Sequence, residues 1–336
     1  MSPHRSFLSF SLWLSVACLY GVFAAAASGT GGTVERQKHS EESLPAGTRV
    51  LRDIPYGEDL QQRFDVYLPP APRNAPVLFI VHGGSWARGH KAHRGLIGNK
   101  AMYWLPQGYV LVSTDYRLLP DAGPKEQARD VANAVAEAQR RAPDWNADAE
   151  RFVLIGHSAG AHLVSLLATR PDLLASAEAV RPVGVISLDS AAMDVVRIMD
   201  SPRHPQLYDR AFGKERAYWI ETSPYHALSR EALPMLAVCS TRIATFCTQA
   251  RTFADKARSL GVRVELLSQN LSHMEVNRRL GEPSPYTEAV AAFIRSRVGA
   301  SNTPTARSDR STTACTAPAT LGRVLSVPCG PHQVRM

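Results

Sequence analysis

The chain has 336 residues, of which 45% are hydrophobic and 20% are charged. This balance is that of a globular protein, and it excludes a disordered or collagen-like chain. The net charge of +8 comes from 38 basic and 30 acidic residues. The basic residues are scattered and form no arginine- or lysine-rich block, so no nucleic-acid partner is expected, and a general adhesion to acidic surfaces is the alternative.

The first segment has the pattern of a secretory signal peptide. Arg5 precedes an apolar stretch at 7–23, and small residues follow at 24–28. A positive start, an apolar middle and a small-residue cleavage site are typical of such peptides. We therefore expect residues 1–27 to be cleaved and the mature protein to be secreted or periplasmic; an uncleaved membrane anchor is the alternative. No later apolar span of about 20 residues follows, so no membrane span is expected after cleavage.

Two polar segments flank the middle of the chain. Residues 28–46 are rich in Gly, Ser, Thr and charged residues and predict a flexible segment. Residues 299–336 are rich in Ser, Thr, Pro and Ala and predict a disordered tail. A single domain is expected over 47–298.

Within this domain, short apolar runs alternate with amphipathic segments. The first run, 65–68, is followed by two prolines and predicts an antiparallel edge strand. Helical spacing of apolar residues over 128–135 and 250–257 predicts helices. Continuous β-branched runs, typical of strands buried on both faces, occupy 77–81, 109–113, 152–155, 183–188, 235–238 and 262–267. The alternation predicts an α/β fold, a mostly parallel central sheet with helices on both faces.

The most specific motif is GHSAG at 156–160. It follows the strand at 152–155 and begins a predicted helix, which is the strand–turn–helix context that G-x-S-x-G requires. The sharp turn strains the backbone of Ser158, and the flanking glycines relieve contacts with the neighbouring chain. The hydroxyl is therefore expected to project at the carboxyl edge of the sheet, near the positive end of a helix.

A second motif, HGGSW at 82–86, directly follows the strand at 77–81. Its glycines allow backbone N–H groups to face a developing oxyanion without obstruction by side chains. An ordinary turn at a strand end is the alternative. The presence of the GHSAG motif further along the chain favours an oxyanion hole.

These motifs resemble the α/β-hydrolase superfamily, in its esterase branch with an HGG-type oxyanion motif. Kynurenine formamidase-like and hormone-sensitive-lipase-like esterases are the groups suggested. The resemblance covers 50–298 and includes DYRLLP at 115–120, similar to the strand-end D-Y-R-L-x-P, and GHSAGAHL at 156–163, similar to the formamidase-like motif. His273 follows the last predicted strand, where the family keeps its catalytic histidine.

The resemblance implies roles for five residues and no cofactor. Ser158 would be the nucleophile, and His273 the general base and then the general acid. The oxyanion donors would be the backbone N–H groups of Gly84, Ser85 and Ala159. The order of serine before histidine agrees with that of the superfamily.

Four other histidines compete for a role. His157 and His162 lie in or just after the GHSAG motif and are expected to pack or to form local hydrogen bonds. His90 and His93 form a metal-like pair without a third ligand nearby, so no metal is expected.

The acid of the catalytic triad is absent from the position that the resemblance implies, which is the loop after the strand at 235–238. Residues 239–247 contain no carboxylate. Thr241 and Thr245 can accept a hydrogen bond from a histidine but carry no charge.

Asp189 is the best substitute acid, because it ends the strand at 183–188 and so lies at the same carboxyl edge of the sheet. It could equally cap a helix or line a pocket wall. Asp194 is the second choice, Glu275 could act only locally, and Asp255 lies on an outer helix.

The long connection at 190–228 predicts a small cap between late strands. Its aromatic residues are expected to supply an apolar wall over the site, with buried aromatics of an outer helix as the alternative: Tyr208, Phe212, Tyr218, Trp219 and Tyr225. Trp86, beside the oxyanion turn, is a further candidate for this wall.

Four cysteines remain once the signal peptide is removed: Cys239, Cys247, Cys315 and Cys329. An even number in an exported chain permits disulfides. The short spacing between Cys239 and Cys247 favours a bridge between them. A free thiol at Cys239 or a bridge to the tail are the alternatives.

The sequence thus predicts an exported serine hydrolase that cleaves small neutral esters, amides or formamides through an acyl-enzyme intermediate. Its partner would be a small-molecule substrate. The alternative is a binding protein with the hydrolase fold, catalytically weak because the triad acid is missing. The oligomeric state stays open.

Overall fold

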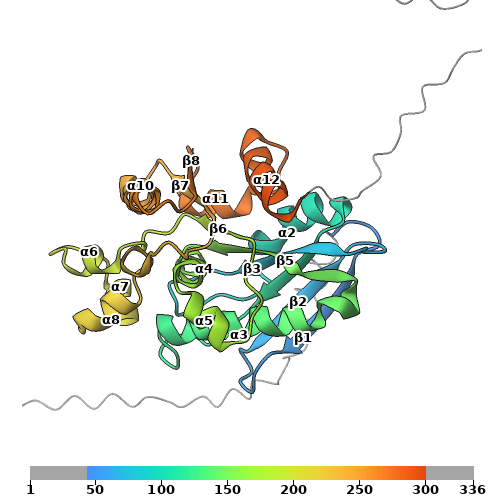
Figure 1. Ribbon diagram of the computed structural model, residues 1–336, viewed down its shortest axis with the longest axis horizontal. Coiled ribbons are helices and arrows are strands. Elements are labelled where there is room, and N and C mark those ends of the chain that lie inside the picture. The colour runs from blue at the N-terminus through green and yellow to red at the C-terminus, as the bar shows by residue number, and fades with distance from the viewer. Residues whose placement is uncertain (1–43, 300–336) are drawn as a thin grey trace, which may run out of the picture. The chain divides into compact units, whose positions relative to one another are not determined.

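Eight strands form one sheet in the computed structural model, which describes residues 44–299. Their order is β1-β2-β4-β3-β5-β6-β7-β8 (Figure 1). The bounds are β1 Arg49–Pro55, β2 Arg63–Leu68, β3 Ala75–Val81, β4 Val110–Thr114, β5 Ala147–His157, β6 Gly184–Leu188, β7 Met235–Ser240 and β8 Val264–Gln269. β2 pairs antiparallel with β1 and with β4, and the other pairs are parallel. The mostly parallel sheet predicted from the sequence is confirmed.

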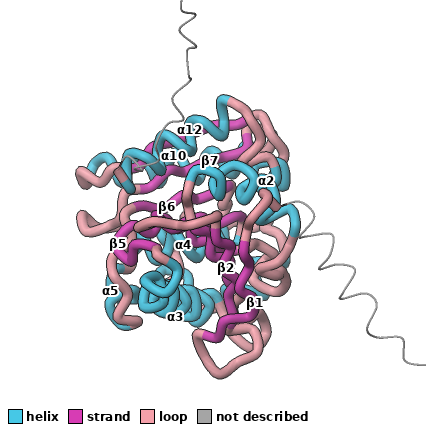
Figure 2. The backbone as a smooth tube through the Cα atoms, turned by 90° about the vertical axis from the view of Figure 1, so that its right-hand side faces the viewer, coloured by secondary structure: helices cyan, strands magenta, loops and turns pink. Residues whose placement is uncertain are grey.

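Helices cover both faces of the sheet. They are α2 Arg94–Trp104, α3 Pro124–Arg141, α4 Ala159–Thr169, α5 Pro171–Ser176, α6 Val195–Met199, α7 Gln206–Phe212, α8 Arg216–Glu221, α9 Pro224–Ala227, α10 Ala244–Ser259, α11 His273–Arg278 and α12 Pro285–Val298. Two 3₁₀ helices span Leu105–Gln107 and Ala142–Trp145. Figure 2 shows α3 and α5 on one side of the strands and α2 and α12 on the other.

The central strand β3 is apolar at every position because both of its faces are covered. In β3, Val77, Phe79 and Val81 pack with one buried cluster that includes residues of α3, α4 and α10. Leu78 and Ile80, between them, pack with a second cluster that includes residues of α2, α11 and α12. Alternation along a strand thus divides one continuous apolar run between two cores.

The prediction that residues 65–68 form the edge strand is wrong. β2 is antiparallel, as expected, but it lies between β1 and β4 and is almost entirely buried. The edge strand on this side of the sheet is β1, whose RVLRDIP sequence mixes charges and proline with apolar residues. This composition lacks the apolar pattern that predicts a strand. Charged residues and proline are, however, common in strands at the edge of a sheet.

The long connection between β6 and β7 contains four short helices, α6 to α9, where the sequence predicts a cap. Most of the predicted segment at 28–46, the signal peptide and the tail lie outside the described residues, and so do Cys315 and Cys329. None of the helices in the described part of the chain is long and apolar enough to cross a membrane.

Candidate active site

Ser158 stands at the sharp turn between β5 and α4. Its backbone has φ 56° and ψ −117°, a strained conformation for a residue with a side chain. The turn needs glycine on both sides. A Cβ on Gly160 would lie 2.3 Å from the carbonyl oxygen of Val81, and one on Gly156 would lie 2.2 Å from that of Gly160. The GHSAG sequence therefore allows the close approach that presents the serine hydroxyl at the edge of the sheet.

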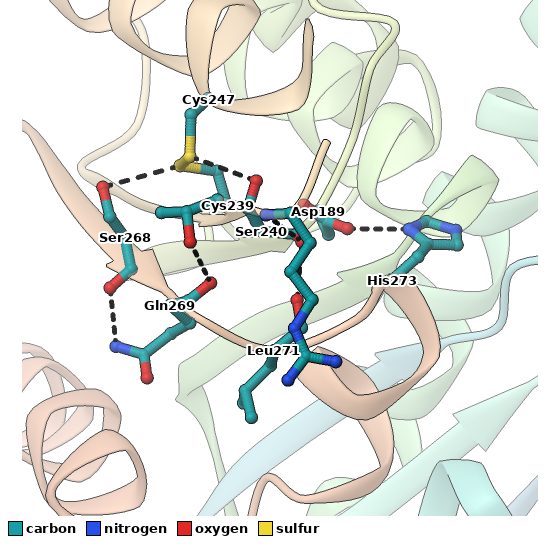
Figure 3. The surroundings of a disulfide bond; sticks show 10 residues. Asp189, Cys239, Ser240, Cys247, Ser268, Gln269, Leu271 and His273 are labelled. Atoms are coloured by element: carbon teal, nitrogen blue, oxygen red, sulfur yellow. Dashed lines mark hydrogen bonds and ion pairs between the residues drawn. A yellow bond between two sulfur atoms is a disulfide. The ribbon is translucent and has the colours of Figure 1, made fainter. Parts of the chain in front are cut away.

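Ser158, His273 and Asp189 form a hydrogen-bonded chain. The Ser158 hydroxyl lies 3.0 Å from Nε2 of His273. Nδ1 of the same ring lies 2.8 Å from Oδ2 of Asp189 (Figure 3). The carboxylate requires Nδ1 to carry the proton, which leaves Nε2 free to accept from the serine. This arrangement is that of a nucleophile, a base and an orienting acid.

Asp189 is held in place by hydrogen bonds to the neighbouring strand β7. It follows the last residue of β6 and is fully buried. Its backbone N–H donates to the carbonyl of Val238 at 2.8 Å, and its Oδ1 accepts the N–H of Ser240 at 2.6 Å. The neighbouring strand β7 thus supplies no carboxylate but holds the one that β6 supplies.

The other two carboxylates considered as acids have local partners. Glu275 and Ser272 form a capping box at the start of α11, the helix whose first residue is His273. Asp194 caps α6 through the N–H of Arg197. Neither carboxylate makes a hydrogen bond to His273 in the described structure.

His157 and His162 both support the site as neutral rings. Burial lowers the pKa of His157 to about 3, and its Nε2 lies 2.9 Å from the carbonyl oxygen of His273, to which it donates. Burial likewise lowers the pKa of His162 to about 4. His162 accepts the indole N–H of Trp86 at 3.2 Å and donates to the carbonyl of Thr222. Both histidines therefore form local hydrogen bonds, as expected.

The HGGSW turn lies against the serine. A Cβ on Gly83 would come within 2.9 Å of the Ser158 Cβ, and Gly84 has φ 130°. The N–H groups of Gly84, Ser85 and Ala159 have no hydrogen-bond acceptor among residues 44–299. Three unpaired donors beside a nucleophile are what an oxyanion hole requires.

The triad opens into a cavity of about 590 Å³ that the cap helps to enclose. Trp86 lines it and packs at 5.9 Å and 5.0 Å from the rings of Tyr208 and Phe212. Of the five predicted aromatic wall residues, Tyr208 is the one that lines this cavity.

The other cap aromatics do not line this cavity and contact either the cap itself or the helices α3 and α10 beneath it, which corrects the predicted wall. The Tyr218 hydroxyl accepts the N–H of Lys125, and the indole N–H of Trp219 donates to the carbonyl of Phe212. Tyr225 packs against the ammonium group of Lys256. Polar residues of the cap, among them two arginines, line the cavity instead.

The disulfide predicted between Cys239 and Cys247 is present, with a Cα–Cα distance of 5.0 Å. It joins the end of β7 to the first turn of α10 (Figure 3). The bridged loop contains Ser240, which binds Asp189, and Phe246, whose ring lies 5.1 Å from that of His273. Sequence reasoning missed both contacts, because no motif distinguishes a backbone donor or a lone phenylalanine.

No cluster of three or more metal-ligating side chains occurs within residues 44–299. Nε2 of His90 lies 3.6 Å from a carboxylate oxygen of Asp115. The alternative function of a weak binding protein rested on a missing triad acid, and the contact between Asp189 and His273 removes that basis.

Known esterases are similar to this chain. A family model described as BD-FAE matches residues 64–190. A probable isoprenylcysteine alpha-carbonyl methylesterase of Oryza sativa is 30% identical over 118 residues, which is 35% of this chain and 28% of that protein. Esterase LipC of Mycobacterium tuberculosis is 28% identical over 228 residues, 62% of this chain and 55% of that protein. The chain thus spans about a quarter to a half of these relatives.

The fold is also that of solved esterases. Esterase B from Lactobacillus Rhamnosis superposes with a TM-score of 0.60 over 79% of this chain and 91% of that one, at 19% identity. These similarities agree with the fold and with two local features of the structure. The features are the GHSAG turn at the strand–helix junction and the HGG turn beside it. The chain has the fold of these esterases and resembles the esterase branch of the α/β-hydrolase superfamily with an HGG-type oxyanion motif.

Proposed function

We propose that the protein is a serine hydrolase that cleaves small carboxylic esters, with amides and formamides as related substrates, through an acyl-enzyme intermediate. The observation that carries this proposal is the continuous hydrogen-bonded chain from the Ser158 hydroxyl through His273 to Asp189. The unpaired N–H groups of the oxyanion turn and the cavity next to the serine support it.

In the acylation step, Oγ of Ser158 attacks the ester carbonyl carbon while Nε2 of His273 takes the hydroxyl proton. Asp189 keeps the ring in the required tautomer and stabilises the imidazolium that forms. The N–H groups of Gly84, Ser85 and Ala159 stabilise the negative oxygen of the tetrahedral intermediate. Its collapse breaks the ester bond, and His273 returns the proton to the departing alcohol.

Deacylation repeats these steps with water. His273 takes a proton from a water molecule, whose oxygen attacks the acyl carbon and forms a second tetrahedral intermediate. When this intermediate collapses, the bond to Oγ of Ser158 breaks and the serine takes back its proton from His273. The products are a carboxylic acid and the free enzyme.

Hydrolysis of p-nitrophenyl acetate and butyrate by the purified chain tests this function. Wild-type protein is expected to turn over both esters, and Ser158→Ala is expected to lose activity while its circular dichroism spectrum and melting temperature stay close to those of the wild type. A variant that keeps more than a few per cent of the activity would exclude Ser158 as the nucleophile.

We also propose that the mature protein is secreted or periplasmic. The signal-peptide pattern at 1–27 supports this, and the Cys239–Cys247 disulfide fits an oxidising compartment. Expression of the full chain in the native host, followed by fractionation and sequencing of the mature N-terminus, tests the proposal. A chain retained in the cytosol with its first residues intact would contradict it.

A further inference from the structure

Two cavities meet at the oxyanion turn. The cavity that contains Ser158 and His273 has a volume of about 590 Å³, and a second cavity has about 530 Å³. Both are lined by Ser85 and by Leu207 of the cap helix α7. A substrate at Ser158 therefore experiences the charges around both spaces.

Those charges are arginines. Arg197 and Arg203, from the cap, line the cavity of the serine, and Arg88 and Arg210 line the second. No aspartate or glutamate lines either of these two cavities. Guanidinium groups stay protonated at any physiological pH, so the positive charge of this region does not depend on conditions.

The three aspartates of the cap have partners other than the cavity arginines. Asp200 lies 2.5 Å from Arg216, outside both cavities, and Asp209 lies 3.0 Å from His204. The hydrogen bond to Asp209 is the main cause of the raised pKa of His204, which favours the ionised form of this pair.

Asp194 contacts His226 at 3.3 Å and caps α6 by accepting the backbone N–H of Arg197. Within residues 44–299, no ion pair links a carboxylate to the guanidinium of the four cavity arginines. Arg210 donates to the side-chain oxygen of Gln206, which is neutral.

Uncompensated positive charge in a partly enclosed space attracts anions and repels cations. A guanidinium also matches a carboxylate in shape, because two parallel N–H groups can bind two oxygens. We propose that the substrate of this hydrolase carries a carboxylate group separate from the ester that is cleaved, and that Arg197 and Arg203 bind it. This inference rests on the proposed function and specifies the substrate class of the same site, in contrast to the neutral esters expected from the sequence.

The test compares charged and neutral substrates of matched shape. One pair, 4-acetoxybenzoate and 4-acetoxybenzamide, places the carboxylate on the alcohol side of the ester. The other, the 4-nitrophenyl monoester of adipic acid and 4-nitrophenyl hexanoate, places it on the acyl side. The quantity measured is the ratio of kcat/KM for the charged substrate to that for the neutral one, because this ratio in a variant relative to wild type cancels differences in intrinsic reactivity.

Three variants accompany the wild type. Arg197→Gln/Arg203→Gln removes both charges, and Arg197→Lys/Arg203→Lys keeps them without the planar fork. Arg258→Gln removes one exposed charge near the C-terminal end of α10. Arg258 lines neither cavity and pairs with Asp255. It serves as the control for a general change in net charge.

For at least one substrate pair, the ratio is expected to fall about tenfold in the glutamine double variant, to be largely restored in the lysine double variant, and to stay near wild type in Arg258→Gln. In the wild type, added salt should lower it because screening weakens the attraction. A fall in the glutamine variant no greater than that in the control, for both pairs, overturns the inference. Hydrolysis of the neutral esters by wild type but not by Ser158→Ala reports separately on the proposed function.

Discussion

Each of the two carboxylate oxygens of Asp189 accepts one hydrogen bond. One bond ties the side chain to the neighbouring strand, and the other orients the ring of His273. Oδ1 accepts the N–H of Ser240, and Oδ2 accepts Nδ1–H of His273. The side chain is fully buried, so water cannot replace either bond. The position of the acid just after β6 therefore depends on β7, and the resemblance implies an acid in the loop after β7.

Asp189→Asn is expected to lower kcat by roughly 10⁴, as the corresponding change does in serine proteases. An asparagine has one acceptor oxygen, so either Ser240 or His273 loses its partner, and the charge that stabilises the imidazolium is lost as well. Steady-state kinetics with a p-nitrophenyl ester measures the effect.

The matched controls are Asp194→Asn and Glu275→Gln, which remove carboxylate charges that cap helices near the site. They should change kcat far less than Asp189→Asn does. Equal and small effects at all three positions would mean that no charged residue completes the triad.

Lys100 is a buried amine that contacts α11, the helix that begins at His273. Its Nζ donates to the carbonyl and side-chain oxygens of Asn277 on α11, at 2.8 Å and 2.9 Å. Burial lowers its pKa to about 7. Between pH 7 and about 10.5 the unfolded chain therefore binds a proton that the folded chain does not, and this contribution to the free energy of unfolding rises with pH.

Lys100→Met should abolish this contribution, so the free energy of unfolding of the variant should rise less between pH 7 and pH 9.5 than that of the wild type. Urea unfolding at several pH values in this window measures it, with Lys125→Met, which removes a lysine from a surface ion pair with Glu221, as the control. Parallel pH dependences of wild type and Lys100→Met would contradict the lowered pKa.

At the scale of elements, the disulfide connects β7 and α10 at the place where both approach the triad. The loop that it closes presents the N–H of Ser240 to Asp189 (Figure 3). It also presents the ring of Phe246 to His273. A bridge in this position restricts the unfolded chain, and it also limits how far these two contacts can move.

Replacement of both cysteines, Cys239→Ser/Cys247→Ser, should lower the free energy of unfolding by about 2–3 kcal/mol, a model-dependent figure. It should also lower kcat, because the acid and the base of the triad both lose a fixed neighbour. Denaturant unfolding and steady-state kinetics measure the two effects.

Ile294→Ala is the control for stability alone. Ile294 is fully buried in the core between α12 and the sheet, and its truncation should cost about 2–5 kcal/mol. If the disulfide variant keeps wild-type kcat at a temperature where both variants are folded, the bridge acts on stability only.

At the scale of the whole molecule, local chemistry made the sheet and the serine turn predictable. Continuous apolar runs such as β3 mark strands buried on both faces, and GHSAG marks a turn that only glycine permits on either side of Ser158. The edge strand β1 was missed because its charged sequence has no such pattern. The chemistry of the cap could not be predicted either, because the orientation of Arg197 or Tyr218 depends on how four short helices pack and not on any local signal.

The acid of the proposed triad could be predicted only in part. Its candidates could be listed from the ends of strands, but the choice of Asp189 depends on the order of β6 and β7 in the sheet and on the loop that follows β7. Contacts between segments far apart in sequence, such as this one with His273, leave no trace in either segment alone.

The most direct test of the account is the site of covalent labelling by a fluorophosphonate, which reacts with an activated serine. Peptide mapping by mass spectrometry should find one adduct, on Ser158, formed rapidly in the wild type, much more slowly in Asp189→Asn and not at all in Ser158→Ala. An adduct on a different serine, or unlabelled protein that still hydrolyses esters, would contradict the triad of Ser158, His273 and Asp189.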